Sequence, residues 1–299
     1  MKYLNVFIAN DSKLFLEQNH IVIDNGTINK LYIEDIKSIV IENKLTTLSA
    51  ALISKLGKYD VSIIVCDDQH LPTSIFLPCN QHSRQRNHLK LQLKSTQPFN
   101  KNLWKQIVIQ KVRNQASALK LAGKEENVHK LLNLCSKVQS GDVGNIEAVS
   151  ARIYFKSLFG ENFKRGEEDF QNAALNFGYS IFRAQIAKTL VGYGFEPSLG
   201  LHHKSELNNF NLADDFIEPF RPLVDIFVFK ELKSDSKLKS SDKARLLTLL
   251  SYNLKVEEKS QESDYAIQLL IESYLRCLEN RAKILKMPAL EKLELKSYE

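Results

Sequence analysis

Three short segments of the chain carry side chains that could together bind one divalent metal ion. Glu147 opens an apolar helical segment, His202 and His203 end a glycine-containing loop, and Glu218 precedes a proline. Carboxylate oxygens are good ligands for Mg²⁺ and Mn²⁺, and a neutral imidazole suits Mn²⁺ and related metals. A cation held in this way can polarise a phosphate group, so these residues predict metal-dependent phosphodiester chemistry.

Each candidate also has a purely structural interpretation. An acid in the first turn of a helix, such as Glu147, can cap the helix or complement its dipole. A histidine of the loop can simply pack against a helix end or lie in water. Side chains of adjacent residues in extended chain point in opposite directions, so only one of His202 and His203 is expected to face a given site. Glu218 can form a weak surface ion pair with Arg221. No spacing rule joins the three segments, so the residues alone provide only candidates.

The first 80 residues have the pattern of a small β-rich domain. Alternating or β-branched runs predict strands at residues 3–9, 13–17, 20–24, 27–33, 36–41, 61–66 and 74–77. Asn25-Gly26 favours a tight hairpin turn between two of them. Leucines and isoleucines at helical spacing predict one helix at residues 47–59, with Thr46 or Thr47 as its cap.

From residue 81 onward the apolar residues recur at helical spacing. Helices are predicted at residues 81–94, 103–121, 128–138, 146–159, 171–191, 241–250 and 264–285, with helical pieces between 211 and 232. Pro219 should interrupt the helical stretch between residues 211 and 232. The polar residues 233–243 should form a loop. The predicted fold class is α+β, with a β-rich domain at residues 1–80 and a larger, all-helical domain at 81–299.

The charge of the chain is unevenly distributed. The net charge is +6, yet no acid occurs between Asp68 and Glu125, where ten lysines and arginines lie. Such asymmetry indicates a surface for a polyanion such as DNA, although two helices with solvated lysine faces would have the same composition. The candidate DNA-binding residues, chosen by their density, are Arg84, Arg86, Lys90, Lys94 and Lys105.

Composition excludes several other classes of protein. The hydrophobic fraction of 43% and charged fraction of 25% are ordinary for a soluble protein. The four cysteines form no Cys-x-x-Cys pair, which argues against a zinc knuckle or a disulfide framework and favours a reducing cytosol. The sequence shows no signal peptide and no apolar run near the ~20 residues of a membrane span. We therefore expect a cytoplasmic, prokaryotic protein with no membrane partner.

Four motifs, in order, resemble those of the CRISPR-associated spacer-acquisition integrases. Residues 144–155 resemble the Glu-Ala-x-x-Ala-Arg-x-Tyr-Phe motif, and residues 174–183 resemble the Leu-Asn-Tyr-Gly-Tyr helix, with Phe177 where a tyrosine is common. Residues 197–203 match the Pro-x-x-Gly-x-x-His loop, and residues 214–225 match the Asp-x-x-Glu-Pro-Phe-Arg-Pro segment. The paired histidines and the chain length are most similar to the subfamily of type II systems.

The resemblance implies a function and a set of residues. Glu147, His203 and Glu218 would be the catalytic metal ligands, with Mn²⁺ or Mg²⁺ as the cofactor, and the spacing from Gly200 selects His203 over His202. The 3′-hydroxyl of a foreign DNA fragment would attack a phosphodiester of a CRISPR repeat array. The implied assembly is a homodimer that binds double-stranded DNA together with a second small CRISPR adaptation protein.

Two other functions remain compatible with the residues. A metal-dependent nuclease would use the same ligands with water as the nucleophile. A non-catalytic DNA-binding scaffold would use the basic residues alone, with the acids and histidines as structural groups.

Overall fold

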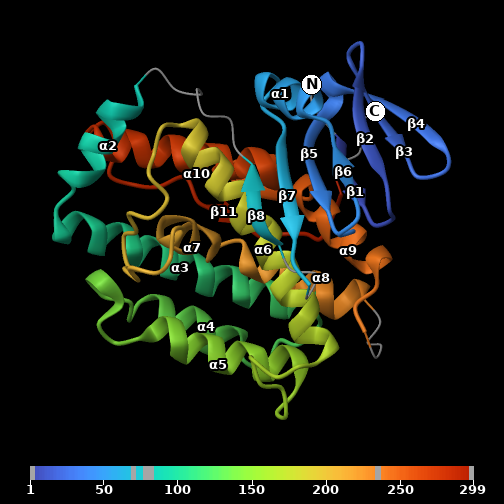
Figure 1. Ribbon diagram of the computed structural model, residues 1–299. Coiled ribbons are helices and arrows are strands. Elements are labelled where there is room, and N and C mark those ends of the chain that lie inside the picture. Colours follow the sequence, from blue (N-terminus) through green and yellow to red (C-terminus); the bar gives the residue numbers. More distant parts are fainter. Residues whose placement is uncertain (1–3, 69–71, 77–83, 233–236, 296–299) are drawn as a thin grey trace. The chain divides into compact units, whose positions relative to one another are not determined.

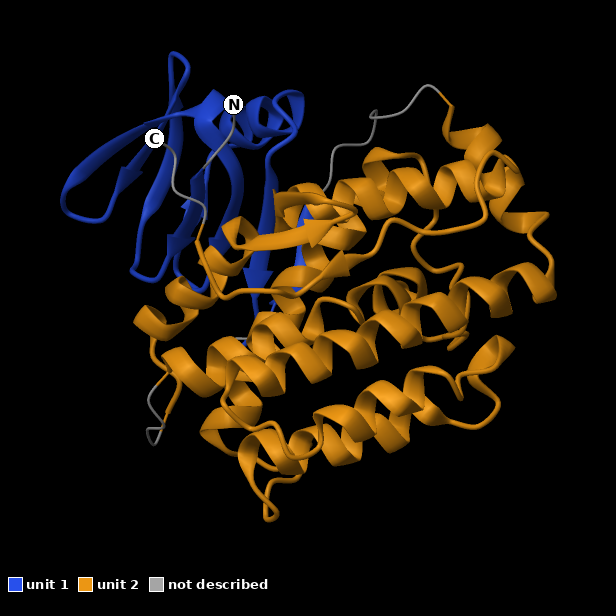
Figure 2. Cartoon of the chain, turned by 180° about the vertical axis from the view of Figure 1, so that it is seen from behind, with its two compact units in different colours: residues 1–81 blue, residues 82–299 orange. Residues whose placement is uncertain are grey.

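The computed structural model describes residues 4–68, 72–76, 84–232 and 237–295. The chain divides into two compact units, Met1–Gln81 and His82–Glu299 (Figure 2). The first unit is rich in strands and the second is mostly helical (Figure 1). The predicted α+β class is therefore confirmed.

In its described residues the first unit has two four-stranded sheets, one α-helix and a short 3-10 helix at Ile33–Asp35. The first sheet has the order β1-β5-β7-β8 and the second the order β4-β3-β2-β6. Their bounds are β1 Leu4–Ile8, β2 Lys13–Glu17, β3 His20–Asp24, β4 Ile28–Tyr32, β5 Ile36–Ile41, β6 Thr47–Leu48, β7 Ser62–Cys66 and β8 Pro72–Phe76. Strands β1, β5 and β7 are parallel, as expected for apolar runs covered on both faces, and β8 is antiparallel at the edge.

Two local predictions in this unit were wrong in detail. The hairpin between β3 and β4 pairs Asp24 with Ile28, so its loop has three residues rather than the two of a tight Asn25-Gly26 turn. The helix α1 spans Ala50–Lys58, and its cap is Ser49, whose hydroxyl accepts the Leu52 N–H. Residues 47 and 48 are instead drawn into β6, because they pair with β2.

The second unit is built around two long helices. Its helices are α2 Gln85–Leu93, α3 Gln97–Leu121, α4 Val128–Cys135, α5 Ile146–Phe159, α6 Phe170–Gly192, α7 Asn211–Ile217, α8 Arg221–Glu231, α9 Ser240–Leu247 and α10 Ser263–Leu278. Helix α3 begins at the cap Thr96 and ends where Gly123 takes a left-handed φ of 70°. It contacts α4, α5, α7 and α8, and α6 contacts α7 to α10.

The prediction that the second domain is all-helical was wrong. Strands β9 Asn253–Val256, β10 Lys259–Glu262 and β11 Pro288–Ala289 form a small sheet in the order β10-β9-β11. Strands β9 and β10 have four residues each and β11 has two, which is too few for a sequence pattern to reveal them. The last helix ends at Leu278 rather than at 285, because Asn280 takes a left-handed φ of 58° just beyond it. Among the described residues, no helix is both long and apolar enough to cross a membrane.

Candidate metal centre

Glu147 lies in the first turn of α5, but it is not the cap of that helix. The carboxylate of Asp142 accepts the backbone N–H groups of Ile146 (3.0 Å) and Glu147 (2.9 Å). Asn145 takes a left-handed φ of 49°, which turns the chain back onto Asp142. Because Asp142 satisfies these donors, the side chain of Glu147 is available for another partner.

That partner is Lys111, which projects from the middle of α3. Its ammonium nitrogen Nζ lies within ion-pair distance of Glu147 Oε1 and Glu218 Oε2. The Lys111 and Glu218 side chains are each 8% exposed, whereas that of Glu147 is 30% exposed. Burial alone would lower the pKa of Lys111, but the two carboxylates outweigh it and raise that pKa. Two carboxylates from different helices therefore share one cation.

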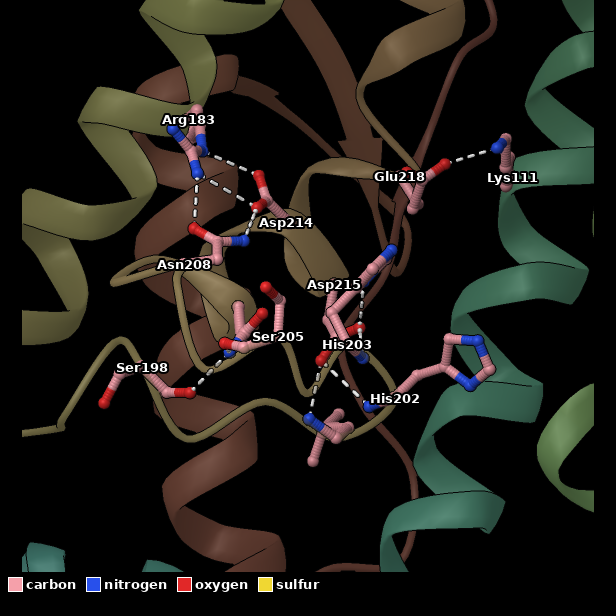
Figure 3. Close-up of polar contacts among 12 residues, drawn as sticks. Lys111, Arg183, Ser198, His202, His203, Ser205, Asn208, Asp214, Asp215 and Glu218 are labelled. Atoms are coloured by element: carbon pink, nitrogen blue, oxygen red, sulfur yellow. Dashed lines mark hydrogen bonds and ion pairs between the residues drawn. The ribbon is translucent and has the colours of Figure 1, made fainter. Parts of the chain in front are cut away.

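Glu218 occupies the break between α7 and α8. Pro219 cannot donate a backbone hydrogen bond, so the helix stops at Ile217 and restarts at Arg221, as predicted. Arg221 Nε donates to Glu218 Oε1 at 2.9 Å (Figure 3 shows Glu218 facing Lys111). Burial tends to raise the pKa of Glu218, but the charges of Arg221 and Lys111 lower it to about 2. Glu218 is therefore a buried, ionised carboxylate.

Arg221 is held in turn by an aromatic ring of α6. Its guanidinium lies 4.4 Å from the ring centre of Tyr179, and the Tyr179 hydroxyl donates to Asp225. Tyr179 belongs to the motif at residues 174–183, which explains why that helix accompanies the Glu218 segment. Phe177, where the motif favours tyrosine, is fully buried in the core.

His203 is oriented by a carboxylate that the sequence analysis did not select. Asp215 of α7 is fully buried, and its Oδ1 lies 2.8 Å from His203 Nδ1. The hydrogen bond with Asp215 raises the pKa of His203, with burial opposing it and the charge of Glu218 adding to it. With Nδ1–H donating to Asp215, the other ring nitrogen, Nε2, keeps its lone pair for a metal.

The same carboxylate organises the backbone of the loop between α6 and α7, residues 193–210, which is called the histidine loop below. Asp215 accepts the N–H groups of Leu201 (2.5 Å), His202 (3.1 Å) and His203 (3.2 Å). Three backbone donors and one imidazole thus converge on a single buried anion, as Figure 3 shows. The loop therefore presents His203 in a fixed orientation.

His202 has a different role. Its ring stacks on Trp104 of α3, with the ring centres 4.3 Å apart and the planes 4° from parallel. In the part of the chain that the structure describes, no carboxylate contacts the His202 ring in the way that Asp215 contacts His203. The geometry therefore favours His203 as the ligand, in agreement with the spacing from Gly200.

Further along, the loop is fastened to α6 and α7. Arg183 of α6 donates to Asp214 (2.7 Å) and Asn208 (2.8 Å), and Asn211 Nδ2 donates to the carbonyl groups of Ser198 and Ser205 (Figure 3). These bonds tie both ends of the loop to rigid helices. The imidazole is thus positioned by the scaffold rather than by the loop alone.

Gly200 lies where any side chain would collide with this loop. A β-carbon there would stand 2.2 Å from the His203 carbonyl oxygen, 2.9 Å from Asn211 Cβ and 3.0 Å from Asp215 Oδ2. The first of these is a backbone atom, which cannot move without displacing His203. The glycine of the loop motif is therefore a packing requirement.

We expect Gly200→Ala to displace the histidine loop and to destabilise the protein by about 1–3 kcal/mol, the usual scale for overpacking. Thermal melting followed by circular dichroism would measure this loss, and metal binding should weaken with it. Gly57→Ala is a suitable control, because a β-carbon at Gly57 of α1 meets no atom within 4 Å. Equal melting temperatures for the Gly200→Ala protein and the wild type would show that the loop tolerates the side chain.

The structure brings together part of the predicted ligand set. Glu147 and Glu218 meet at the Lys111 ammonium, and His203 is close enough for the charge of Glu218 to raise its pKa. Within the described ranges, however, no three His, Cys, Asp or Glu side chains are arranged to hold a metal ion as they stand. The two carboxylates and the imidazole are nevertheless ligands of the kinds that bind Mn²⁺ or Mg²⁺. Glu218 Oε2 is buried and receives no directed hydrogen bond, although Lys111 is near it.

The candidate DNA-binding residues lie on α2 and α3. Arg86, Lys90 and Lys94 recur every four residues and are exposed, so they line one face of α2 and its end. Arg84 precedes the helix and is exposed, and Lys105 of α3 is half-buried.

Of the ten bases in the acid-free stretch, Lys111 instead binds carboxylates, and Lys124 donates to the Leu158 carbonyl at 2.8 Å. The role of the five candidates in DNA binding stays a prediction.

Comparison with known proteins identifies the family. Residues 6–248 match the family described as CRISPR associated protein Cas1. The chain belongs to the Cas1 family. Over 304 aligned positions it is 41% identical to the CRISPR-associated endonuclease Cas1 of Neisseria meningitidis serogroup C (strain 8013), covering 100% of this chain and 99% of the relative. The resemblance deduced from the four motifs is therefore confirmed.

Solved structures share the Cas1 fold at low sequence identity. A casposase bound to its integration product superposes with a TM-score of 0.77 at 18% identity, over 96% of this chain and 93% of the casposase. A chain of a Cas6-RT-Cas1–Cas2 complex gives a TM-score of 0.71 at 16% identity, over 98% of this chain and 36% of the larger one. At these identities the structures establish the fold.

Proposed function

We propose that this Cas1-family chain is a divalent-metal-dependent DNA integrase that inserts short foreign DNA fragments into a CRISPR repeat array. The observation that carries the proposal is the meeting of Glu147 and Glu218 at one buried cation position, beside a carboxylate-held His203. The family membership supports the CRISPR context, and the fold shared with a casposase bound to an integration product supports joining as the reaction.

Glu147, His203 and Glu218 would hold the ion, and Mn²⁺ or Mg²⁺ suits their two carboxylates and one imidazole. When bound, the ion would supply a Lewis acid for a phosphate oxygen and for the attacking hydroxyl. The chain itself orients the ligands: Asp215 holds His203, and Arg221 holds Glu218. The exposed bases of α2 would bind the DNA backbone without regard to sequence, so this binding should weaken with salt.

The joining step conserves the number of phosphodiester bonds. The 3′-oxygen of the incoming fragment forms a new bond to phosphorus, and the bond between that phosphorus and the 3′-oxygen of the target strand breaks. The attacking hydroxyl loses a proton and the departing 3′-oxygen gains one. No high-energy cofactor is needed, and the protein contributes mainly by positioning the reactants and stabilising charge.

Two fragment ends must be joined at two places, so we expect the chain to act as a homodimer. A second small adaptation protein would connect the dimers, and solved complexes in which Cas1 is named together with Cas2 support this partner. The repeat array is chromosomal, which would place the reaction in the cytoplasm of a prokaryotic cell.

The alternative is a hydrolytic nuclease, which the name of the Neisseria relative, an endonuclease, favours. One experiment separates the two functions. The protein is incubated with Mn²⁺, the second adaptation protein, a fluorescent duplex with free 3′ ends and a supercoiled plasmid that carries the repeat array. Integration predicts plasmid that carries the label covalently, and the label should be absent when the duplex has 3′-dideoxy ends. Nicked plasmid without label would establish hydrolysis instead.

A further inference from the structure

We propose that Lys111 is a built-in counter-ion of the metal centre, which holds Glu147 and Glu218 together in the metal-free protein and must leave them when a divalent cation binds. The inference rests on the proposed metal centre and adds a competition that controls its loading. It is carried by the position of the Lys111 ammonium, which lies within ion-pair distance of both carboxylates.

The charges of the centre balance without any metal. Lys111 and Arg221 are positive, and Glu147 and Glu218 are negative. The Lys111 and Glu218 side chains are each only 8% exposed, so each charge requires a partner of opposite sign there. The charges of these four groups therefore cancel, and Lys111 keeps Glu147 and Glu218 from simply repelling each other.

A divalent cation changes this balance. It would need the same carboxylate oxygens that Lys111 now contacts, and a positive ammonium beside it would repel it. Two cations cannot occupy one position between Glu147 and Glu218. Metal binding and the Lys111 contacts thus compete, and each must weaken the other by the same factor.

The lysine side chain is suited to such a displacement. An ammonium on a flexible four-carbon stem can leave by rotation about its side-chain bonds, without movement of the helix that carries it. Glu218 Oε2 receives no directed hydrogen bond even with Lys111 near, so the present pairing leaves its acceptor incompletely used. Arg221, which donates to the other oxygen of Glu218, can remain in place when Lys111 moves.

The test compares Lys111→Met with the wild type by isothermal titration of the full-length protein with Mn²⁺ and by thermal melting with and without Mn²⁺. Without its competitor, the variant should bind Mn²⁺ more tightly, by roughly 5–150-fold, the usual range of coupling between two binding events. It should also melt earlier than the wild type without metal, and Mn²⁺ should stabilise it by a larger shift. Lys111→Arg, which keeps the charge, should remain close to the wild type.

Lys120→Met is the matched control, because Lys120 lies on the same helix and is exposed; its Mn²⁺ affinity should be unchanged. If Lys111→Met does not fold, Lys111→Gln replaces it, and Mn²⁺ should restore folding to either neutral variant by replacing the lost charge. Equal or weaker Mn²⁺ binding by the neutral variants, or their failure to fold even with Mn²⁺, would overturn the counter-ion role. Absence of Mn²⁺ binding in the wild type as well would instead contradict the proposed metal centre.

Discussion

Glu147→Gln is expected to reduce DNA joining by about 10²–10³-fold, the range seen when one electrostatic contact to a transition state is removed. Glutamine has the same shape but lacks the charge that a divalent cation requires. The fold should persist, because Asp142 rather than Glu147 receives the first N–H groups of α5, and the Glu147 side chain is 30% exposed. The joining assay with Mn²⁺ measures the effect.

Glu161→Gln provides the control for Glu147→Gln. Glu161 follows the same helix, its side chain is 79% exposed, and its ion pair with Lys156 is a surface contact. This variant should join DNA at the wild-type rate. A Glu147→Gln protein that melts well below the wild type would show that the ion pair of Glu147 with buried Lys111 contributes to folding. A Glu147→Gln protein that joins DNA normally would remove Glu147 from the centre.

His203→Ala should likewise abolish joining while the binding of duplex DNA survives. Asp215 orients this imidazole, so the substitution removes a proposed ligand whose position the fold fixes. The side chain is 42% exposed, and therefore little stability should be lost. Gel-shift titration would follow DNA binding, and joining would be measured separately on the same preparation.

His202→Ala is the neighbouring control. It removes a ring that stacks on Trp104, so it should reduce stability slightly and leave most of the joining activity. If His202→Ala eliminated joining and His203→Ala did not, the assignment of the ligand would be reversed. Loss of DNA binding in the His203→Ala protein would point to a scaffold role for the loop.

Elements with strong local signals could be predicted from the sequence. Strands β2, β3 and β5 and helix α5 have the predicted bounds, because alternation, β-branching and a regular apolar spacing all agree there. The break at Pro219 could be predicted for a different reason, because a single proline is enough to interrupt a helix. The strands β9–β11 were missed because they depend on pairing between segments that have little individual propensity.

The candidate site was predicted only in part. Glu147, His203 and Glu218 followed from residue types and motifs, but Asp215 and Lys111 did not, because their roles depend on contacts between distant segments. A signal for Lys111 did exist. It lies four residues after Ile107 and three after Val108, on the buried face of a predicted helix, where a charge requires a partner. Asp215 and Glu218 are three residues apart, a spacing that places both near one side of α7 and its end.

The central claim is that Glu147, His203 and Glu218 hold one divalent cation, and crystals soaked in Mn²⁺ test it most directly. An anomalous difference map should show a single manganese peak bound to oxygens of both glutamates and to His203 Nε2, with the Lys111 ammonium withdrawn from the carboxylates. A map in which manganese binds elsewhere, and Lys111 still bridges Glu147 and Glu218, would contradict the account.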